Sequence, residues 1–170
     1  MRDLTRPNAL RPAYVRLAEA GFDVFTPLHW VLTAASGKRV RRQVPVVHDL
    51  LFVRSEREAL DPVVAATATL QYRYRRGGAY CEPLTVPTAD MERFIRAVRS
   101  ADAAEVRYYT PEELTASMVG REVTIHGGTL DGYRGRLLRL RGSNKRRLLV
   151  SLTGLLTAAV EVNAEYVTVE

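Results

Sequence analysis

The first part of the chain carries apolar residues at helical spacing. In NALRPAYVRLAEAG they recur every three or four positions, which predicts an amphipathic helix with Asn8 as N-cap and Gly21 as its stop. Pro12 fits only the first turn, so the helix is expected to start after Asn8. The predicted apolar stripe consists of Leu10, Ala13, Tyr14, Leu17 and Ala18.

Two strand-like segments follow this helix. FDVFTPL places Phe22 and Val24 on one face and Phe25 on the other, and VPVVHDLLFVR is a nearly continuous apolar run that predicts a strand. In the second strand we expect Leu51 and Val53 to be buried. The basic stretch between the two segments, Lys38 to Arg42, is expected to be the solvated flank of a hairpin.

A further strand and helix complete the N-terminal pattern. In VVAATATLQYRYRRGG a helical turn leads into a strand in which Tyr72 and Tyr74 oppose the neighbouring polar side chains, and a turn at 77–78 closes it. VPTADMERFIRAVRS predicts a helix with Thr88 as N-cap and an apolar stripe of Met91, Phe94, Ile95 and Val98. This order of elements predicts an antiparallel sheet backed by helices, an α+β fold.

The pattern changes near Tyr109. YTPEELTAS is polar and contains a proline, and the segments after Gly120 are short alternating strands: EVTIH, LLVSL, TAAVEV and EYVTV. We therefore expect an N-terminal domain at 1–108, a linker at 109–118 and a C-terminal domain at 119–170. Short strands in so small a domain must cover their own edges, which favours a small closed β-barrel.

The first predicted turn of this C-terminal domain is rich in glycine. In GGTLDGYRGRLLRL, Gly128, Gly132 and Gly135 lie between two predicted strands. Glycine is suited there to positive φ in a tight turn and to close passage of one backbone over another. The basic residues that follow, Lys145, Arg146 and Arg147, are expected at a hairpin tip.

Composition narrows the functional classes. The 170 residues have a net charge of +6, a single cysteine, Cys81, and three histidines without ligand spacing, so we expect no metal and no cofactor. We also find no nucleophile elbow, phosphate-binding loop or acid pair, and we expect no catalysis, since Glu112, Glu113, Glu122 and Asp131 fall in a predicted linker and turns. No apolar segment or leader points to a membrane, and we expect a cytoplasmic protein.

The glycine-rich turn resembles a known motif. GTLDGYRG, with Gly128, Leu130, Gly132 and Gly135 and followed by Leu137 and Leu140, is similar to the KOW motif. The N-terminal helix, FDVFTP, the basic hairpin and VPVVHDLLFV resemble the N-terminal (NGN) domain of NusG-type transcription elongation factors. The sequence VPVVHDLLFV is most similar to that of the UpxY- and RfaH-type specialised paralogues, which act as antiterminators.

This resemblance implies a fold and partners. The implied fold is an RRM- or ferredoxin-like NGN domain followed by an SH3-like KOW barrel. The NGN domain would bind the clamp helices of the RNA polymerase beta-prime subunit through an apolar patch, which by position comprises Val47, Leu50, Phe52, Phe25 and Tyr14. Basic residues would contact non-template DNA, with candidates Arg6, Arg11, Arg16, Arg73, Arg75 and Arg76. The KOW domain would recruit Rho or a small-subunit ribosomal protein.

Other interpretations fit the same residues. The arginines also suit a solvated basic face, and a KOW barrel also suits an RNA-binding protein of translation or ribosome assembly. One relative refolds its KOW domain into a helical hairpin. Here the valine- and threonine-rich period-two pattern predicts strands instead.

Overall fold

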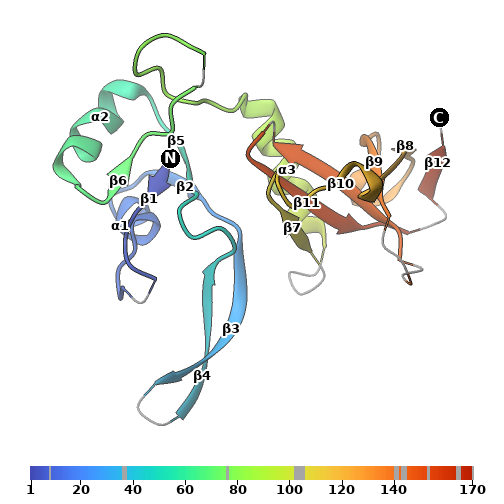
Figure 1. Ribbon diagram of the computed structural model, residues 1–170, viewed down its shortest axis with the longest axis horizontal. Helices are drawn as coiled ribbons and strands as arrows, with labels where there is room; N and C mark the ends of the chain where they lie inside the picture. Colours follow the sequence, from blue (N-terminus) through green and yellow to red (C-terminus); the bar gives the residue numbers. More distant parts are fainter. Residues whose placement is uncertain are drawn as a thin grey trace. The chain divides into compact units, whose positions relative to one another are not determined.

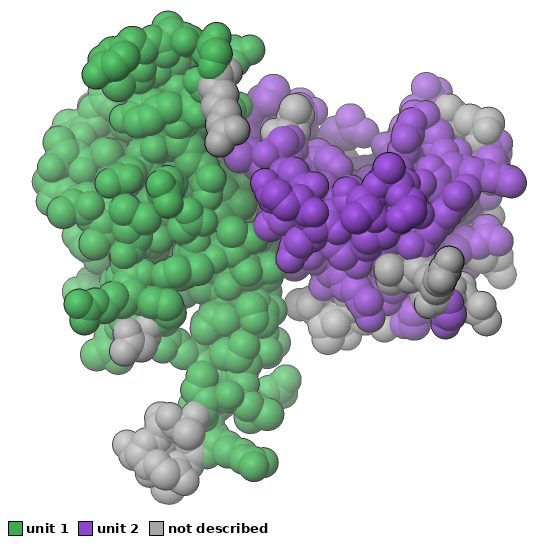
Figure 2. Space-filling model, in the orientation of Figure 1, with its two compact units in different colours: residues 1–85 green, residues 86–170 purple. Residues whose placement is uncertain are grey.

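The chain divides into two compact units, Met1–Thr85 and Val86–Glu170 (Figure 2). The structure is a computed structural model (Figure 1). It describes residues 1–7, 9–35, 38–75, 77–101, 106–139, 142, 145–152, 154–163 and 166–169, and backbone alone at 34, 35 and 38. The predicted roles of Asn8, Arg76 and Leu140 lie outside the described residues.

The first unit contains a small antiparallel sheet. Strands β1 (Arg2–Asp3) and β6 (Leu70–Gln71) pair with each other, as do β2 (Asp23–Phe25) and β5 (Phe52–Arg54). Backbone hydrogen bonds join the two pairs, since Met1 N donates to Leu51 O at 2.7 Å and Leu51 N donates to Met1 O at 3.3 Å. Residues next to β1 and β5 thus connect the two-stranded sheets β1–β6 and β2–β5 into one small layer.

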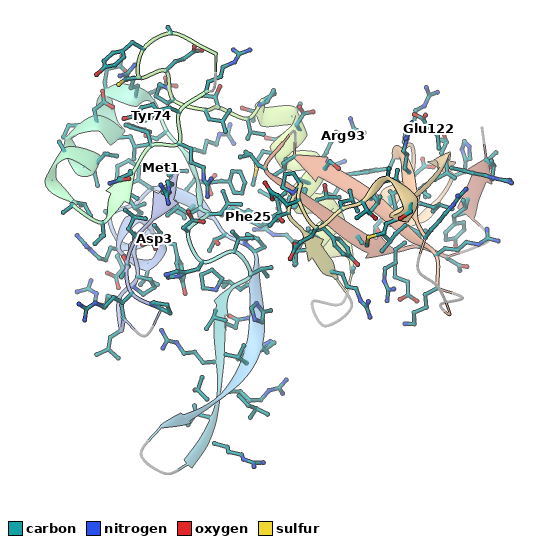
Figure 3. The ribbon with its side chains drawn as sticks, in the orientation of Figure 1. Met1, Asp3, Phe25, Tyr74, Arg93 and Glu122 are labelled. Atoms are coloured by element: carbon teal, nitrogen blue, oxygen red, sulfur yellow. The ribbon has the colours of Figure 1, made fainter. Side chains whose placement is uncertain are left out.

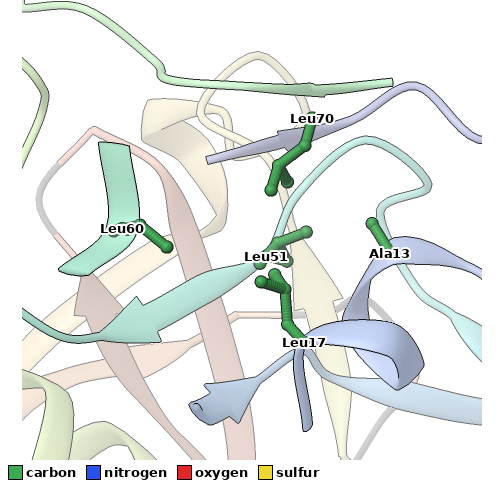
Figure 4. Close-up of a cluster of buried hydrophobic side chains, with 5 residues drawn as sticks. All are labelled: Ala13, Leu17, Leu51, Leu60 and Leu70. Carbon is green, nitrogen blue, oxygen red and sulfur yellow. The ribbon is translucent and has the colours of Figure 1, made fainter. Parts of the chain in front are cut away.

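Two helices pack on one face of this sheet. Helices α1 (Ala13–Glu19) and α2 (Arg57–Ala66) meet the strands in a buried cluster (Figure 4). Its buried members are Ala13, Leu17, Leu51, Leu60 and Leu70, and Phe22, Val24 and Val53 pack against it. The predicted burial of Leu51 is thereby confirmed, and Val53 is partly buried against the same cluster.

Helix α1 begins later than the stripe suggested. Pro12 is its N-cap, and the carboxylate of Asp3 accepts hydrogen bonds from Thr5 N at 2.9 Å and Ala13 N at 3.0 Å. Leu10 precedes the helix and is 96% exposed, so its assignment to the buried stripe is wrong. The helix starts at Ala13 because the backbone of Pro12 is extended, with ψ of 163°, and its ring disfavours a helical turn before it.

A hairpin of β3 (Leu28–Ala35) and β4 (Lys38–Pro45) projects from the first unit (Figure 1). It is followed by the apolar run in which we predicted one continuous strand. That prediction is wrong over 46–51, because β4 ends at Pro45 and a turn at 48–49 precedes β5.

The second unit joins one helix to a six-stranded sheet. Helix α3 (Thr88–Ser100) packs against β10 and β11. The strand order is β12–β8–β9–β10–β11–β7, and every pairing is antiparallel. The strands are β7 (Arg107–Tyr109), β8 (Val119–Ile125), β9 (Arg134–Leu138), β10 (Arg147–Leu152), β11 (Leu156–Glu161) and β12 (Val167–Val169), with 3-10 turns η1 (Ala116–Met118) and η2 (Gly128–Leu130).

The predicted closed barrel is not found among the described strands. Strand β7 pairs with the free edge of β11, and no described pairing joins β12 to β7. Because α3 and β7 contact the C-terminal strands, the division between units falls at residue 85, upstream of the predicted linker at 109–118. The α+β class with antiparallel pairing is confirmed. In the described part of the chain, no helix has the length and apolar character needed to cross a membrane.

Candidate functional site

Two aromatic rings lie on the sheet face opposite the core of the first unit. Phe25 and Phe52 are direct partners across β2 and β5, and their ring centroids lie 6.3 Å apart. Their neighbours Val24 and Val53 pack into the helix-covered core, so alternation along the strands turns both rings away from it. Both rings are half-buried, and Figure 3 labels Phe25. We call this pair the Phe25–Phe52 surface.

The other predicted members of the apolar patch are placed differently. Leu50 is only 3% exposed, so the expectation that its side chain is open to a partner is wrong. Val47 is half-buried in the loop between β4 and β5. Tyr14 belongs to α1, which packs on the core side of the sheet, and it therefore does not join the Phe25–Phe52 surface.

Asp49 organises the loop between β4 and β5. Its carboxylate accepts hydrogen bonds from Arg2 Nε at 3.1 Å and Arg73 Nη2 at 3.0 Å. Sequence reasoning missed this residue, because a lone carboxylate inside an apolar run gives no sign of its partners. The ion pair means that Arg73 is held within the first unit and is not a freely available phosphate ligand.

The remaining predicted nucleic-acid contacts differ in their availability. Arg6 and Arg16 are exposed, whereas Arg11 pairs with Glu19. Arg75 forms an ion pair with Glu82 at 3.7 Å. Their role in binding stays a prediction.

Tyr72 and Tyr74 lie next to these arginines with their ring centroids 6.4 Å apart. Tyr74 is 53% exposed and is available for stacking (Figure 3). The hydroxyl of Tyr72 instead donates to Asp61 Oδ1 at 2.7 Å. Burial, followed by this hydrogen bond, raises the pKa of Tyr72 from 10.0 to about 12.

Replacement of Tyr72 by phenylalanine tests this contact. We expect Tyr72→Phe to lower the free energy of unfolding by about 1 kcal/mol, the usual net value of one hydrogen bond. A tyrosine with a raised pKa stabilises the fold below pH 10, and that contribution is lost as the pH rises through about 12. The difference in tyrosinate absorbance between wild type and variant should therefore rise with pH and have its midpoint near pH 12. A midpoint near 10 would contradict the assignment.

The glycine-rich segment turns at Gly128 and Gly132 as predicted, whereas Gly135 lies within β9 and not between the strands. Gly128 and Gly132 have φ of +68° and +75°, values that favour glycine. At Gly135 an added Cβ would lie 2.9 Å from Leu149 O and 3.1 Å from Leu148 Cδ1, so this glycine permits close passage of β9 and β10. The side chain of Leu130 is buried beneath the turn.

The basic run before β10 is only partly an exposed tip. Lys145 Nζ lies 2.9 Å from Glu161 Oε2. Arg147 is buried as the first residue of β10 and lies 3.8 Å from the same carboxylate. Its prediction as part of a tip is wrong, because strand pairing with Glu161 draws it into the sheet.

Comparison with known proteins adds no relative. No protein-family model matches the chain, and no curated protein sequence matches it.

Proposed function

We propose that this chain is a NusG-type transcription elongation factor of the antiterminator kind. Its first unit binds the clamp helices of the RNA polymerase beta-prime subunit, and its C-terminal strands bind a second partner, Rho or a small-subunit ribosomal protein. The proposal requires no catalysis. Its support is the sequence resemblance together with an α+β first unit that carries an aromatic pair outside its core.

The observation that carries the proposal is the Phe25–Phe52 surface. Helices α1 and α2 cover one face of the sheet. The core of the unit therefore accounts for large apolar side chains on that face, but not for those on the other face. Two adjoining phenylalanines on the other face supply apolar area suited to a docked helix pair. Aromatic residues are also enriched at the centres of protein interfaces.

Nucleic-acid contact accompanies this docking. Arg6, Arg16 and Tyr74 are exposed and combine phosphate-binding charge with a stacking ring. A protein that holds polymerase and the non-template strand at once stabilises the transcribing complex without chemistry. We assign the NGN role to the first unit and the KOW role to the turn at 128–135 with its flanking strands.

A charge placed on the aromatic pair tests the polymerase contact. We expect Phe52→Glu to weaken binding of a beta-prime clamp-helix fragment at least tenfold, because docking would bury an unpaired carboxylate. Leu10→Glu is the matched control, since Leu10 belongs to the same unit, is exposed and lies outside the pair. Isothermal titration calorimetry measures both affinities, and circular dichroism confirms that each variant is folded.

Three outcomes separate the interpretations. Selective loss in Phe52→Glu supports the proposed surface. Equal affinities of Phe52→Glu and wild type contradict it. Absence of clamp-helix binding, combined with tight salt-sensitive binding of structured RNA, would favour the RNA-binding protein of translation or ribosome assembly.

A further inference from the structure

The hairpin of β3 and β4 carries positive charge without any carboxylate of its own. Its sequence from Leu28 to Pro45 contains four lysine or arginine residues and neither aspartate nor glutamate. Among the described strands, β3 and β4 pair with each other alone, and the hairpin extends away from the body of the first unit (Figure 1). It therefore presents positive charge on a slender two-stranded ribbon.

The strand register gathers particular side chains on one face. Residues directly opposite each other in an antiparallel pair share a face, as do residues two apart along a strand. Trp30 is opposite Gln43, Leu32 is opposite Arg41, and position 34 is opposite Arg39. One face thus carries a tryptophan, a leucine, a glutamine and two arginines, and we call it the Trp30 face.

The Trp30 face is open and its charges are available. Trp30 is 51% exposed and Leu32 is 69% exposed. The Arg41 guanidinium carbon lies 5.4 Å from the centroid of the Trp30 ring, within the range of a cation–π contact. Among the described residues, neither Arg39 nor Arg41 forms an ion pair with a carboxylate.

Protection against aggregation explains only some of the side chains on the Trp30 face. Lysine and arginine on exposed strands discourage pairing with another sheet. That role explains the arginines, but it does not explain a large exposed tryptophan beside an exposed leucine, since such side chains favour association. A ligand that uses an aromatic ring and positive charge together explains both features.

We propose that the Trp30 face binds single-stranded nucleic acid. A base stacks on Trp30, and the adjacent phosphates contact Arg39 and Arg41. These two arginines are two residues apart on β4, so their Cα atoms are separated by about 7 Å. Rings combined with basic side chains are the common means of binding single strands. An acidic peptide would use the arginines but would leave the ring without a stacking partner. This surface uses none of the arginines predicted above to contact DNA, which are at positions 6, 11, 16, 73, 75 and 76, and it requires no polymerase.

The wild-type chain provides a direct test, because Trp30 is its only tryptophan. The probe is an oligothymidylate of about 15 nucleotides, near the upper site size of single-strand binding folds. We expect saturable quenching of tryptophan fluorescence that follows binding measured by anisotropy of the labelled oligonucleotide. Binding without quenching, or no binding at low salt, would overturn the proposal.

Variants separate stacking from charge. We expect Trp30→Ala to weaken binding roughly tenfold and Trp30→Phe to recover part of the loss, whereas Tyr80→Ala, which removes another exposed ring of the first unit, leaves affinity unchanged. The double variant Arg39→Ala/Arg41→Ala should reduce the slope of log affinity against log salt by about 1.4, the value for two phosphate contacts with a single strand.

Matched ligands and a matched charge control complete the experiment. Arg96→Ala/Arg99→Ala removes the same charge from exposed positions on α3 and should leave quenching and affinity unchanged. Equal losses in the two double variants would overturn the proposal. Oligouridylate that quenches Trp30 would support it and would extend it to RNA. A DNA duplex or polyglutamate that quenches Trp30 as strongly as the single strand would overturn it.

Discussion

Gly135→Val is expected to lower the free energy of unfolding of the second unit by about 3 kcal/mol, at the upper end of the usual cost of overpacking. Gly135 is in β9, opposite Val123 of β8, with β10 on the other side. Its added Cβ would meet a backbone oxygen, that of Leu149, at 2.9 Å, and a backbone atom in a paired strand has little freedom to move away. Urea unfolding followed by circular dichroism measures the change.

The neighbouring Gly132 provides the control for this prediction. It has a positive φ of +75°, but no atom lies within 4 Å of an added Cβ. Gly132→Asn should therefore change stability by less than about 1 kcal/mol, since asparagine tolerates the left-handed region. Equal effects of Gly135→Val and Gly132→Asn would show that crowding between β9 and β10 is not the reason for glycine at position 135.

Asp3→Ala is expected to destabilise the first unit by about 3 kcal/mol, because hydrogen bonds to charged groups contribute roughly 1.5–3 kcal/mol each and a buried donor left unpaired adds a penalty. The buried Asp3 carboxylate accepts from the backbone of Thr5 and of Ala13, where α1 begins (Figure 3). Its removal leaves the buried Ala13 N–H without that acceptor. Thermal and urea unfolding should show the loss.

A surface aspartate in the same unit controls for the change in net charge. Asp23 is exposed at the start of β2, and Asp23→Ala should alter the free energy of unfolding by less than about 0.5 kcal/mol, as is usual for surface substitutions. If Asp3→Ala and Asp23→Ala unfold at the same urea concentration, the carboxylate of Asp3 does not stabilise the start of α1.

Local periodicity predicted the strand faces of the first unit well. Val24 and Val53 point to the core and Phe25 points away from it, because a period of two leaves no other arrangement for a strand covered on one side. The turn glycines were also predictable, since positive φ at Gly128 and Gly132 is a local requirement, whereas the crowding at Gly135 comes from β10.

Contacts between distant segments account for what the sequence did not reveal. The apolar run before β5 looked continuous, but the Asp49 carboxylate binds Arg2 and Arg73, which lie far from it in sequence, and a turn replaces part of the expected strand. Leu50, which follows this turn, is buried although its neighbours suggested an open patch.

In the second unit, too, the sequence pattern did not reveal contacts between distant segments, here the pairing of the strands. Alternation in its segments correctly predicted short strands, but it carried no information on which edges pair. Strand β7, placed at the boundary of the expected linker, adds to the edge of β11, and α3 packs on β10 and β11. Both interactions depend on tertiary packing that no periodicity in a single segment encodes.

The most direct test of the proposed function is a photo-crosslink from the Phe25–Phe52 surface. A photoreactive phenylalanine analogue replaces Phe52 in the full chain, which is mixed with core RNA polymerase and irradiated, and the same analogue at Leu10 serves as the control. Our account predicts that position 52 crosslinks to the beta-prime clamp helices, identified by mass spectrometry, and that position 10 does not. A folded protein whose position 52 gives no crosslink to the clamp helices, or the same yield as position 10, would contradict it.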